Sequence, residues 1–413
     1  MALEAGGSNP LAHPIYCVKT AGTAGRFFFA ERADTRKLAA FRLSETMKHG
    51  RYSSMISSSG KNSRTVNLLK IIQFDRPGWV PAEVGIMPAA WMKYREDIEK
   101  IVLRHGRLFP GYRKGSKDFD EIPGPLYEEG LHTDCWGSVW RNIQRGLDSI
   151  VVREPLADWA DFKSWRPPDP FTDDLFGPRD WQSAKRSIDA ARCRGEVAMG
   201  SGLPHGFFYM RLMFLRGFEG LMLDMASGDS RLDELIAIVE NYNVAVLARF
   251  LEMGVECVAC GEDLGMQHAL PMSPQMWRKF IKPSYEAIFG PCRDRGVPVF
   301  LHTDGHILEI IDDLIDTGVR MLNPQVRANG LSGLVEQARG KVAIKLDLDR
   351  QLFPFATPRE IEDHIEGAFE ALYMKEGGLM LYAEIEPDVP LENIETICST
   401  LESVCRLPEA DTI

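Results

Sequence analysis

Short apolar runs alternate with amphipathic stretches over the second half of the chain. The runs are rich in Val, Ile and Leu and only a few residues long, which predicts buried strands. The expected strands lie at residues 196–200, 256–259, 297–301, 320–322, 342–346 and 378–382, with one more at 79–86 in the first half. Between them the apolar positions recur with the helical period, so strands and helices alternate.

Helix boundaries are marked by residues that favour them. In segment 306–317 apolar residues recur at helical spacing and form one stripe. Thr357, Pro358 and Glu360 form a capping-box start for a helix, and Ser273 with Pro274 begins another. A last amphipathic helix is expected from about residue 391.

Six strand–helix units in series predict a parallel sheet. Two further units from the first half would close a (β/α)8 TIM barrel, which we expect over residues 55–413 as a single domain. An open doubly wound sheet is the rival, but no Gly-rich dinucleotide loop follows any expected strand. Residues 1–54 are rich in Ser, Gly and Ala, which indicates an irregular N-terminal extension.

Composition excludes several classes of partner. The formal net charge of −11 disfavours nucleic acid and anionic lipid. No run of about 18 apolar residues exists, so we expect no membrane span. Eight cysteines without framework spacing predict reduced thiols and a cytoplasmic protein. The one CxxC pattern, at 257–260, lacks the second pair that a zinc ribbon needs.

Polar residues follow almost every expected strand, and a barrel carries its active site at the carboxyl ends of its strands. These positions therefore predict an enzyme acting on a small molecule. The candidates, in chain order, are His205, Tyr209, Glu262, Asp263, Gln267, His302, Asp304, Asn323, Asp347 and Glu384.

The stretch from 299 to 306, VFLHTDGH, is the most informative of these. His302 and Asp304 are two residues apart on a strand end, so their side chains point to the same side and could share a metal. Two plainer interpretations stay open: a core histidine bonded to a backbone carbonyl, and Asp304 as the N-cap of helix 306–317. Glu262 and Asp263 could likewise be a cavity carboxylate beside a turn cap, or two solvated acids.

Longer stretches resemble a known family. They include DCWGSVW at 134–140, EPLADWADFKSWRPPDP at 154–170, GEDLGMQHALPMSPQMWRKFIKPSYEAIF at 261–289 and PVFLHTDGHILEIIDDLIDTGVRMLNPQ at 298–325. Together they resemble the uroporphyrinogen decarboxylase superfamily of (β/α)8 barrels, which also contains zinc-dependent, corrinoid-linked methyltransferases. The resemblance spans residues 66–404.

The resemblance is nearer to the methyltransferases than to the decarboxylases. Methyltransferases typically read His-x-Cys-Gly where this chain has His302 and Asp304, and carry a second Cys where it has Glu384. The resemblance thus implies a site of harder ligands, His302, Asp304 and Glu384, for zinc or another divalent metal. The Arg-rich motif of the decarboxylases has no match in 55–100.

Three functions are consistent with these residues. The first is metal-assisted methyl transfer with a corrinoid protein as partner, in which His302, Glu262 or Asp263 is catalytic as metal ligand or acid–base group. The second is a metal-free decarboxylase acting on a porphyrinogen-like or other small acid. The third is a non-catalytic barrel that binds a ligand or a corrinoid protein. Substrate contacts are expected from His205, Tyr209, Gln267, Asn323 and Asp347. The oligomeric state stays open, a homodimer included.

Overall fold

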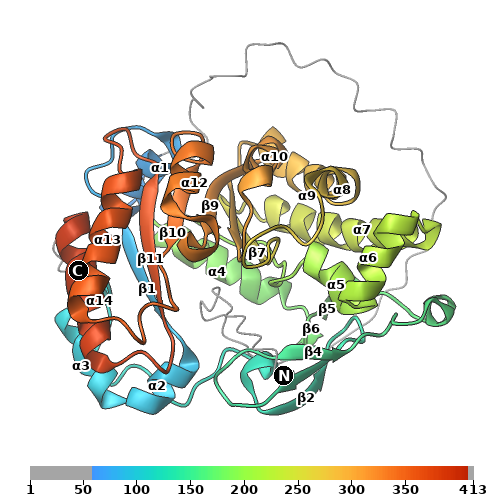
Figure 1. The fold of residues 1–413 in the computed structure, drawn as a ribbon, viewed down its shortest axis with the longest axis horizontal. Helices are drawn as coiled ribbons and strands as arrows, with labels where there is room; N and C mark the ends of the chain where they lie inside the picture. Colours follow the sequence, from blue (N-terminus) through green and yellow to red (C-terminus); the bar gives the residue numbers. More distant parts are fainter. Residues whose placement is uncertain (1–57, 408–413) are drawn as a thin grey trace.

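A curled parallel sheet of six strands forms the centre of the molecule. The computed structural model describes residues 58–407, and the predicted extension 1–54 lies outside them. The strand order is β1-β11-β10-β9-β8-β7 (Figure 1). The strands are β1 (Ala82–Ile86), β7 (Val258–Glu262), β8 (Val299–Thr303), β9 (Val319–Pro324), β10 (Ala343–Asp347) and β11 (Leu379–Ile385).

The first and last strands of this sheet are neighbours. Ala82 of β1 pairs in parallel with Leu381 of β11, as it would in a barrel. At the opposite edge the expected strand 196–200 is reduced to one bridge, between Met199 and Cys257. Gly202 follows in the left-handed region, with φ of +62°, which ends the extended run. Over residues 58–407 the curled parallel sheet is therefore confirmed, but closure by eight strands is not seen.

The first half of the described chain supplies covering elements instead of a second strand–helix unit. A three-stranded antiparallel sheet, in the order β2-β3-β4, and a small β5-β6 hairpin lie outside the central sheet. These elements are α1 (Ser63–Gln73), α2 (Pro88–Tyr94), α3 (Glu96–Arg104), η3 (Pro125–Tyr127), β2 (Gly130–Thr133), β3 (Val139–Asn142), β4 (Ile150–Arg153), η4 (Trp159–Lys163), β5 (Asp173–Asp174), β6 (Gly177–Pro178) and α4 (Trp181–Cys193).

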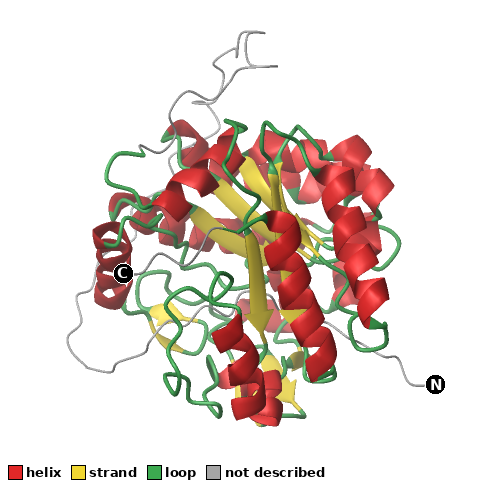
Figure 2. Ribbon diagram, turned by 90° about the vertical axis from the view of Figure 1, so that its left-hand side faces the viewer, coloured by secondary structure: helices red, strands yellow, loops and turns green. Residues whose placement is uncertain are grey.

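Helices flank the central sheet on its outer side (Figure 2). They are α5 (Tyr209–Arg216), α6 (Phe218–Ser227), α7 (Ser230–Glu252), α8 (Pro274–Phe280), α9 (Lys282–Asp294), η5 (Leu308–Ile310), α10 (Ile311–Thr317), α11 (Val326–Asn329), α12 (Leu331–Gln337), α13 (Pro358–Leu372) and α14 (Leu391–Cys405). The predicted starts are confirmed: Ser273 caps α8, and Thr357 with Glu360 forms the capping box of α13.

The expected helix 306–317 is split, and its start differs from the prediction. It begins as the 3-10 turn η5 and continues as α10, and no side chain caps η5. The N-cap role considered for Asp304 is therefore wrong, because the helix starts four residues later. The backbone N–H of Ile307 instead donates to Asn329 Oδ1 at 2.9 Å.

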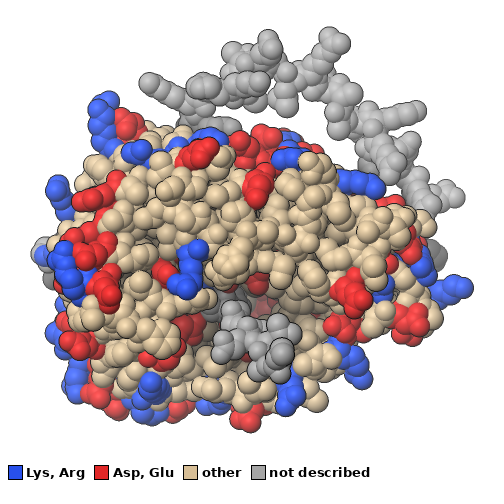
Figure 3. Space-filling model, viewed as in Figure 1, with Lys and Arg blue, Asp and Glu red and all other residues tan. Residues whose placement is uncertain are grey.

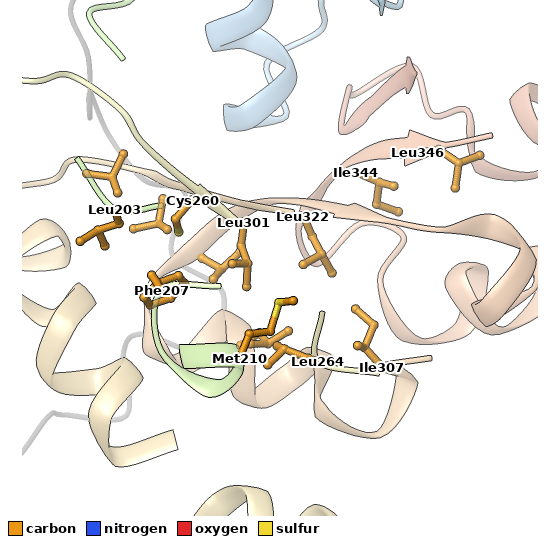
Figure 4. Packing of buried hydrophobic residues seen from close by; sticks show 14 of the residues in the cluster. Leu203, Phe207, Met210, Cys260, Leu264, Leu301, Ile307, Leu322, Ile344 and Leu346 are labelled. Atoms are coloured by element: carbon orange, nitrogen blue, oxygen red, sulfur yellow. The ribbon is translucent and has the colours of Figure 1, made fainter. Parts of the chain in front are cut away.

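Alternate residues along each central strand belong to two different cores. Leu301, Leu322 and Ile344 face the flanking helices and pack in the large core, near Phe207 and Leu264 (Figure 4). The intervening residues form a second, smaller core inside the curl: Cys257, Phe300, Met321, Ala343 and Met380, with Ile71 of α1. Both faces of the strands are thus buried, as the continuous apolar runs predict for a parallel sheet.

The described surface has mixed charge. On the face shown in Figure 3, Lys and Arg side chains are interspersed with Asp and Glu, and the face is hollowed near its centre. Within residues 58–407 no helix has both the length and the apolar content needed to cross a bilayer.

Candidate active site

The inner face of the sheet changes from apolar to polar along the strands. At the amino ends it presents Phe300, Met321 and Met380, which are buried together. Two or four residues further along the same strands lie His302 on β8, Asn323 on β9, Asp347 on β10 and Glu384 on β11, all buried. Because the strands are parallel, these polar side chains meet at the carboxyl end, where the sequence predicted the site.

His302 is held in one orientation by Asn323. Asn323 Nδ2 donates to the Lys345 carbonyl oxygen at 2.6 Å, so Asn323 Oδ1 faces His302 and lies 2.9 Å from its Nδ1. An amide oxygen can only accept, so Nδ1 carries a proton. The other ring nitrogen, Nε2, lies 3.0 Å from Asp304 Oδ1. The expectation that His302 and Asp304 share a side is confirmed by this distance.

A buried arginine that was not predicted from the sequence organises the acidic groups. Arg350, in the loop after β10, lies 2.6 Å from Glu384 Oε1 and 3.5 Å from Asp304 Oδ1, and also pairs with Asp347. Tyr382 Oη donates to the other Glu384 oxygen at 2.9 Å. The sequence feature that could have indicated this role is the position of Arg350, three residues after Asp347 at the end of a strand.

This cluster shifts the pKa values of its carboxyl groups in different directions. Burial raises the pKa of Glu384 well above its ordinary value, and it raises that of Asp347, although Arg350 opposes both shifts. Burial acts the same way on Asp304, but His302 and then Arg350 outweigh it and hold its pKa below the ordinary value. Asp304 is therefore the carboxylate of this group that stays ionised most readily.

A second group of donors includes His302 itself. His205 Nε2, in the loop before α5, is 3.2 Å from Asp263 Oδ1, which follows β7. The ring centroids of His205 and His302 are 5.8 Å apart. One ligand atom each from His205, Asp263 and His302 lies within 4.8 Å of the others. Burial lowers the pKa of His205, but Asp263, with smaller effects of Asp304 and Glu262, raises it to about 9.

Glu262 is turned away from these donors and anchors helix α5. Its carboxylate accepts backbone N–H groups of Phe208, of Tyr209 at 3.1 Å and of Met210 at 2.9 Å. Burial raises the pKa of Glu262 to about 7, against the effect of these hydrogen bonds. Both oxygens are engaged at a helix start, which favours a positioning role over the acid–base role predicted from the sequence.

Two glycines let the loops after β7 and β8 touch. Gly305 has φ of +83°, and a Cβ there would lie closer than 3.0 Å to the carbonyl group of Gly265. Gly265 N–H donates to the Asp304 carbonyl oxygen at 3.2 Å, and Gly305 N–H donates to Gln325 Oε1 at 3.0 Å. This backbone contact fixes the loops that carry Asp263 and Asp304.

A cavity of about 210 Å³ opens beside these loops. Its lining includes Asp263, Gln267, Asp304, Gln325 and Arg350. Of the expected substrate contacts, Gln267 lines this cavity, whereas Tyr209, Asn323 and Asp347 do not. Tyr209 is buried at the start of α5 and Asp347 is paired with Arg350.

A larger hollow of about 570 Å³ lies elsewhere, between β2 and the β5-β6 hairpin. It is lined by Asp134, whose carboxylate pairs with Arg211 at 2.7 Å and accepts from Trp140 Nε1 at 3.0 Å. Because that carboxylate is already satisfied within the fold, the smaller cavity at the strand ends is the better candidate for catalysis.

Comparison with known proteins gives two matches, one to a family model and one to a solved structure. A family model described as uroporphyrinogen decarboxylase (URO-D) matches residues 143–404. A solved methyltransferase from Methanosarcina mazei is similar in fold, with a TM-score of 0.53 and 15% identity, over 82% of this chain and 98% of that one.

Two further comparisons add no information about the family. A Yersinia pestis dihydropteroate synthase reaches a TM-score of only 0.29 at 19% identity, over 41% of this chain and 64% of that one. No curated protein matches the chain. Since the family model covers more than half of the sequence, the chain belongs to the uroporphyrinogen decarboxylase family.

Proposed function

We propose that this protein is a methyltransferase-type enzyme of its family, which moves a methyl group to or from a small molecule at the carboxyl end of the curled sheet. The observation that carries the proposal is the buried His302–Asp304 pair, 3.0 Å apart, whose carboxylate lines a cavity. Family membership and the Methanosarcina mazei methyltransferase neighbour support this choice of reaction.

The size and lining of the cavity indicate the class of substrate. A volume of about 210 Å³ is below the roughly 300–1,000 Å³ of sites for drug-sized ligands. Gln267 and Gln325 offer amide donors and acceptors at its wall. The substrate is therefore a small polar molecule, and the cavity is poorly suited to a whole tetrapyrrole.

The residues around the cavity divide into acting and positioning groups. Asp304 stays ionised and borders the cavity, so it can take a proton from, or return one to, the heteroatom that exchanges the methyl group. Asn323 sets the tautomer of His302. Arg350 holds Asp304, Asp347 and Glu384 together and offsets their charge.

A divalent metal is the group that the family resemblance implies. When bound, it would supply a Lewis acid for the attacking or leaving heteroatom. Of the set expected from the sequence, Glu384 is already engaged by Arg350 and Tyr382. His302 is shared between that set and the group it forms with His205 and Asp263. The methyl carrier in this proposal is a corrinoid held by a partner protein.

Methylcobalamin is a suitable probe of this function. The purified protein is incubated with methylcobalamin and a panel of small thiols, amines and alcohols, and demethylation is followed by absorbance. We expect catalysed demethylation with at least one acceptor, and its loss in His302→Ala. His268→Ala is the matched control, because His268 is exposed on the nearby loop.

Two other outcomes would replace the proposal. Release of CO2 from small carboxylic acids, without any demethylation, would establish a decarboxylase. Saturable binding of small molecules or of a corrinoid protein, with no turnover of either kind, would establish a binding protein.

A further inference from the structure

His205, Asp263 and His302 bring three possible ligand atoms close together. Three buried atoms face one another there, namely His205 Nε2, Asp263 Oδ1 and His302 Nε2. Each has a close polar neighbour, yet none makes a hydrogen bond of good geometry. Buried polar atoms are nearly always hydrogen-bonded, so three such atoms at one point indicate a missing ligand.

The nature of that ligand follows from the chemistry of the three atoms. Asn323 engages Nδ1 of His302, so Nε2 is the nitrogen that this ring can offer to an ion. The Asp263 carboxylate is an acceptor only, and His205 offers a second imidazole whose proton a binding ion would displace. Two imidazole nitrogens and one carboxylate oxygen are the donors that a borderline divalent ion such as Zn²⁺ or Co²⁺ prefers.

The spacing also suits such an ion. A tetrahedral zinc with bonds of about 2.1 Å keeps its donor atoms roughly 3.4 Å apart. His205 Nε2 and Asp263 Oδ1 are already 3.2 Å apart, and all three atoms lie within 4.8 Å. Small rotations of these side chains would bring the three donor atoms within bonding distance of one ion.

The acidic cluster beside the three donors already holds a positive charge. Arg350 places its positive charge among Asp304, Asp347 and Glu384, which disfavours a second cation at that point. Its contact with Asp304 is the longest, at 3.5 Å. Asp263 borders the cavity, so a fourth position can be reached by substrate.

From these contacts we infer that His205, Asp263 and His302 form a divalent metal site of two histidines and one carboxylate, in place of the His302, Asp304 and Glu384 set predicted from the sequence. Asn323 acts in this site as a positioning residue through the hydrogen bond that sets the His302 tautomer. The inference deepens the proposed function, but binding of the ion does not depend on which reaction is catalysed.

Metal titration of the full-length protein tests the site. Protein stripped with chelator is titrated with Zn²⁺ and with Co²⁺, and bound metal is counted by elemental analysis after gel filtration. We expect one equivalent in the wild type, and loss of tight binding in His205→Ala and in Asp263→Asn. Asn323→Leu should weaken binding by about 10–100-fold.

Matched variants make the result specific. His268→Ala and Asp349→Asn are the controls; His268 is exposed, and Asp349 lines the same cavity but pairs with Arg327. Both controls and Glu384→Gln should keep one equivalent of metal. Binding that survives His205→Ala and Asp263→Asn, or that is lost in Glu384→Gln, overturns the inference, as does a wild type that binds no metal.

A measurement on the wild type covers the case in which a variant fails to fold. X-ray absorption at the zinc edge should count two imidazole ligands and no sulfur. One imidazole would point to the set predicted from the sequence. Metal bound as expected, with no methyl transfer, would contradict the proposed function while leaving the metal site intact.

Discussion

Arg350 and Glu384 are joined by a buried ion pair of 2.6 Å, between the loop after β10 and the end of β11. Neither side chain has appreciable contact with solvent, and Arg350 also pairs with Asp347. Removing the guanidinium would leave buried carboxylates without a counter-charge, which costs far more than the loss of a surface pair.

Arg350→Met should therefore lower the free energy of unfolding by about 3–5 kcal/mol. Urea denaturation followed by circular dichroism measures this change. Arg327→Met is the control, because the half-exposed Arg327–Asp349 pair should be worth less than about 1 kcal/mol. Equal losses in the two variants would show that Arg350 does not hold the carboxylates.

The close contact between Gly265 and Gly305 leads us to predict that a side chain at residue 305 destabilises the fold. Gly305→Ala adds a Cβ that meets the Gly265 carbonyl group at a positive φ, so it should cost well over the roughly 1–3 kcal/mol of backbone strain alone. Gly330→Ala has a similar φ of +68° with no atom within 4 Å of the new Cβ, and should cost only the strain. Thermal unfolding of both variants compares them, and equal costs would rule out the loop contact.

An ion pair near the amino end of β7 should stabilise the fold to an extent that depends on pH. Glu256 Oε2 is 2.6 Å from Lys61 Nζ and accepts the Ala198 N–H at 2.9 Å. Burial opposes ionisation, but these partners outweigh it and lower the pKa of Glu256 below its ordinary 4.5. A lowered pKa means that the charged form stabilises the fold above pH 4.5, and that this contribution is lost as the pH falls through the folded value.

Glu256→Gln should thus destabilise the protein by about 1 kcal/mol at neutral pH, discounted because the group is partly exposed. The difference from the wild type should shrink as the pH falls below 4.5. Denaturation curves at several pH values measure it, with Glu196→Gln as an exposed control. A difference that grows in acid would contradict the sign.

Asp304 offers a way to separate chemistry from metal binding. Asp304→Asn keeps the shape but removes the charge near His302, and should lower the methyl-transfer rate by about 10²-fold or more. Metal content, measured on the same preparation, should stay near one equivalent. Loss of metal in this variant would make Asp304 a ligand instead of a proton-transfer group.

Sequence patterns predicted those parts of the molecule that depend on local order. Buried parallel strands read as apolar runs, and the two-residue spacing of His302 and Asp304 was enough to place them on one side. The helix starts at Ser273 and Thr357 were predictable because capping is local. The gathering of polar side chains at one edge of the sheet was predictable because parallel strands all end at the same edge.

The groups that the sequence did not reveal are joined across loops. His205 meets Asp263 because Glu262 anchors the backbone at the start of α5, a contact between segments more than 50 residues apart. Arg350 reaches three carboxylates because the loop after β10 folds inward. Neither the path of a loop nor the direction of an unpaired side chain is set by hydrophobic periodicity.

The adjacency of β1 and β11 has a consequence for biogenesis. Ala82 and Leu381 are neighbours in the sheet although nearly 300 residues separate them in sequence. Pairs so far apart close late in folding, because the entropy of the intervening chain is lost first. Glu384, the partner of Arg350, also enters with β11. A nascent chain therefore cannot complete the charge balance of this cluster until β11, the last strand of the described residues, leaves the ribosome, and a product truncated before β11 should be unstable.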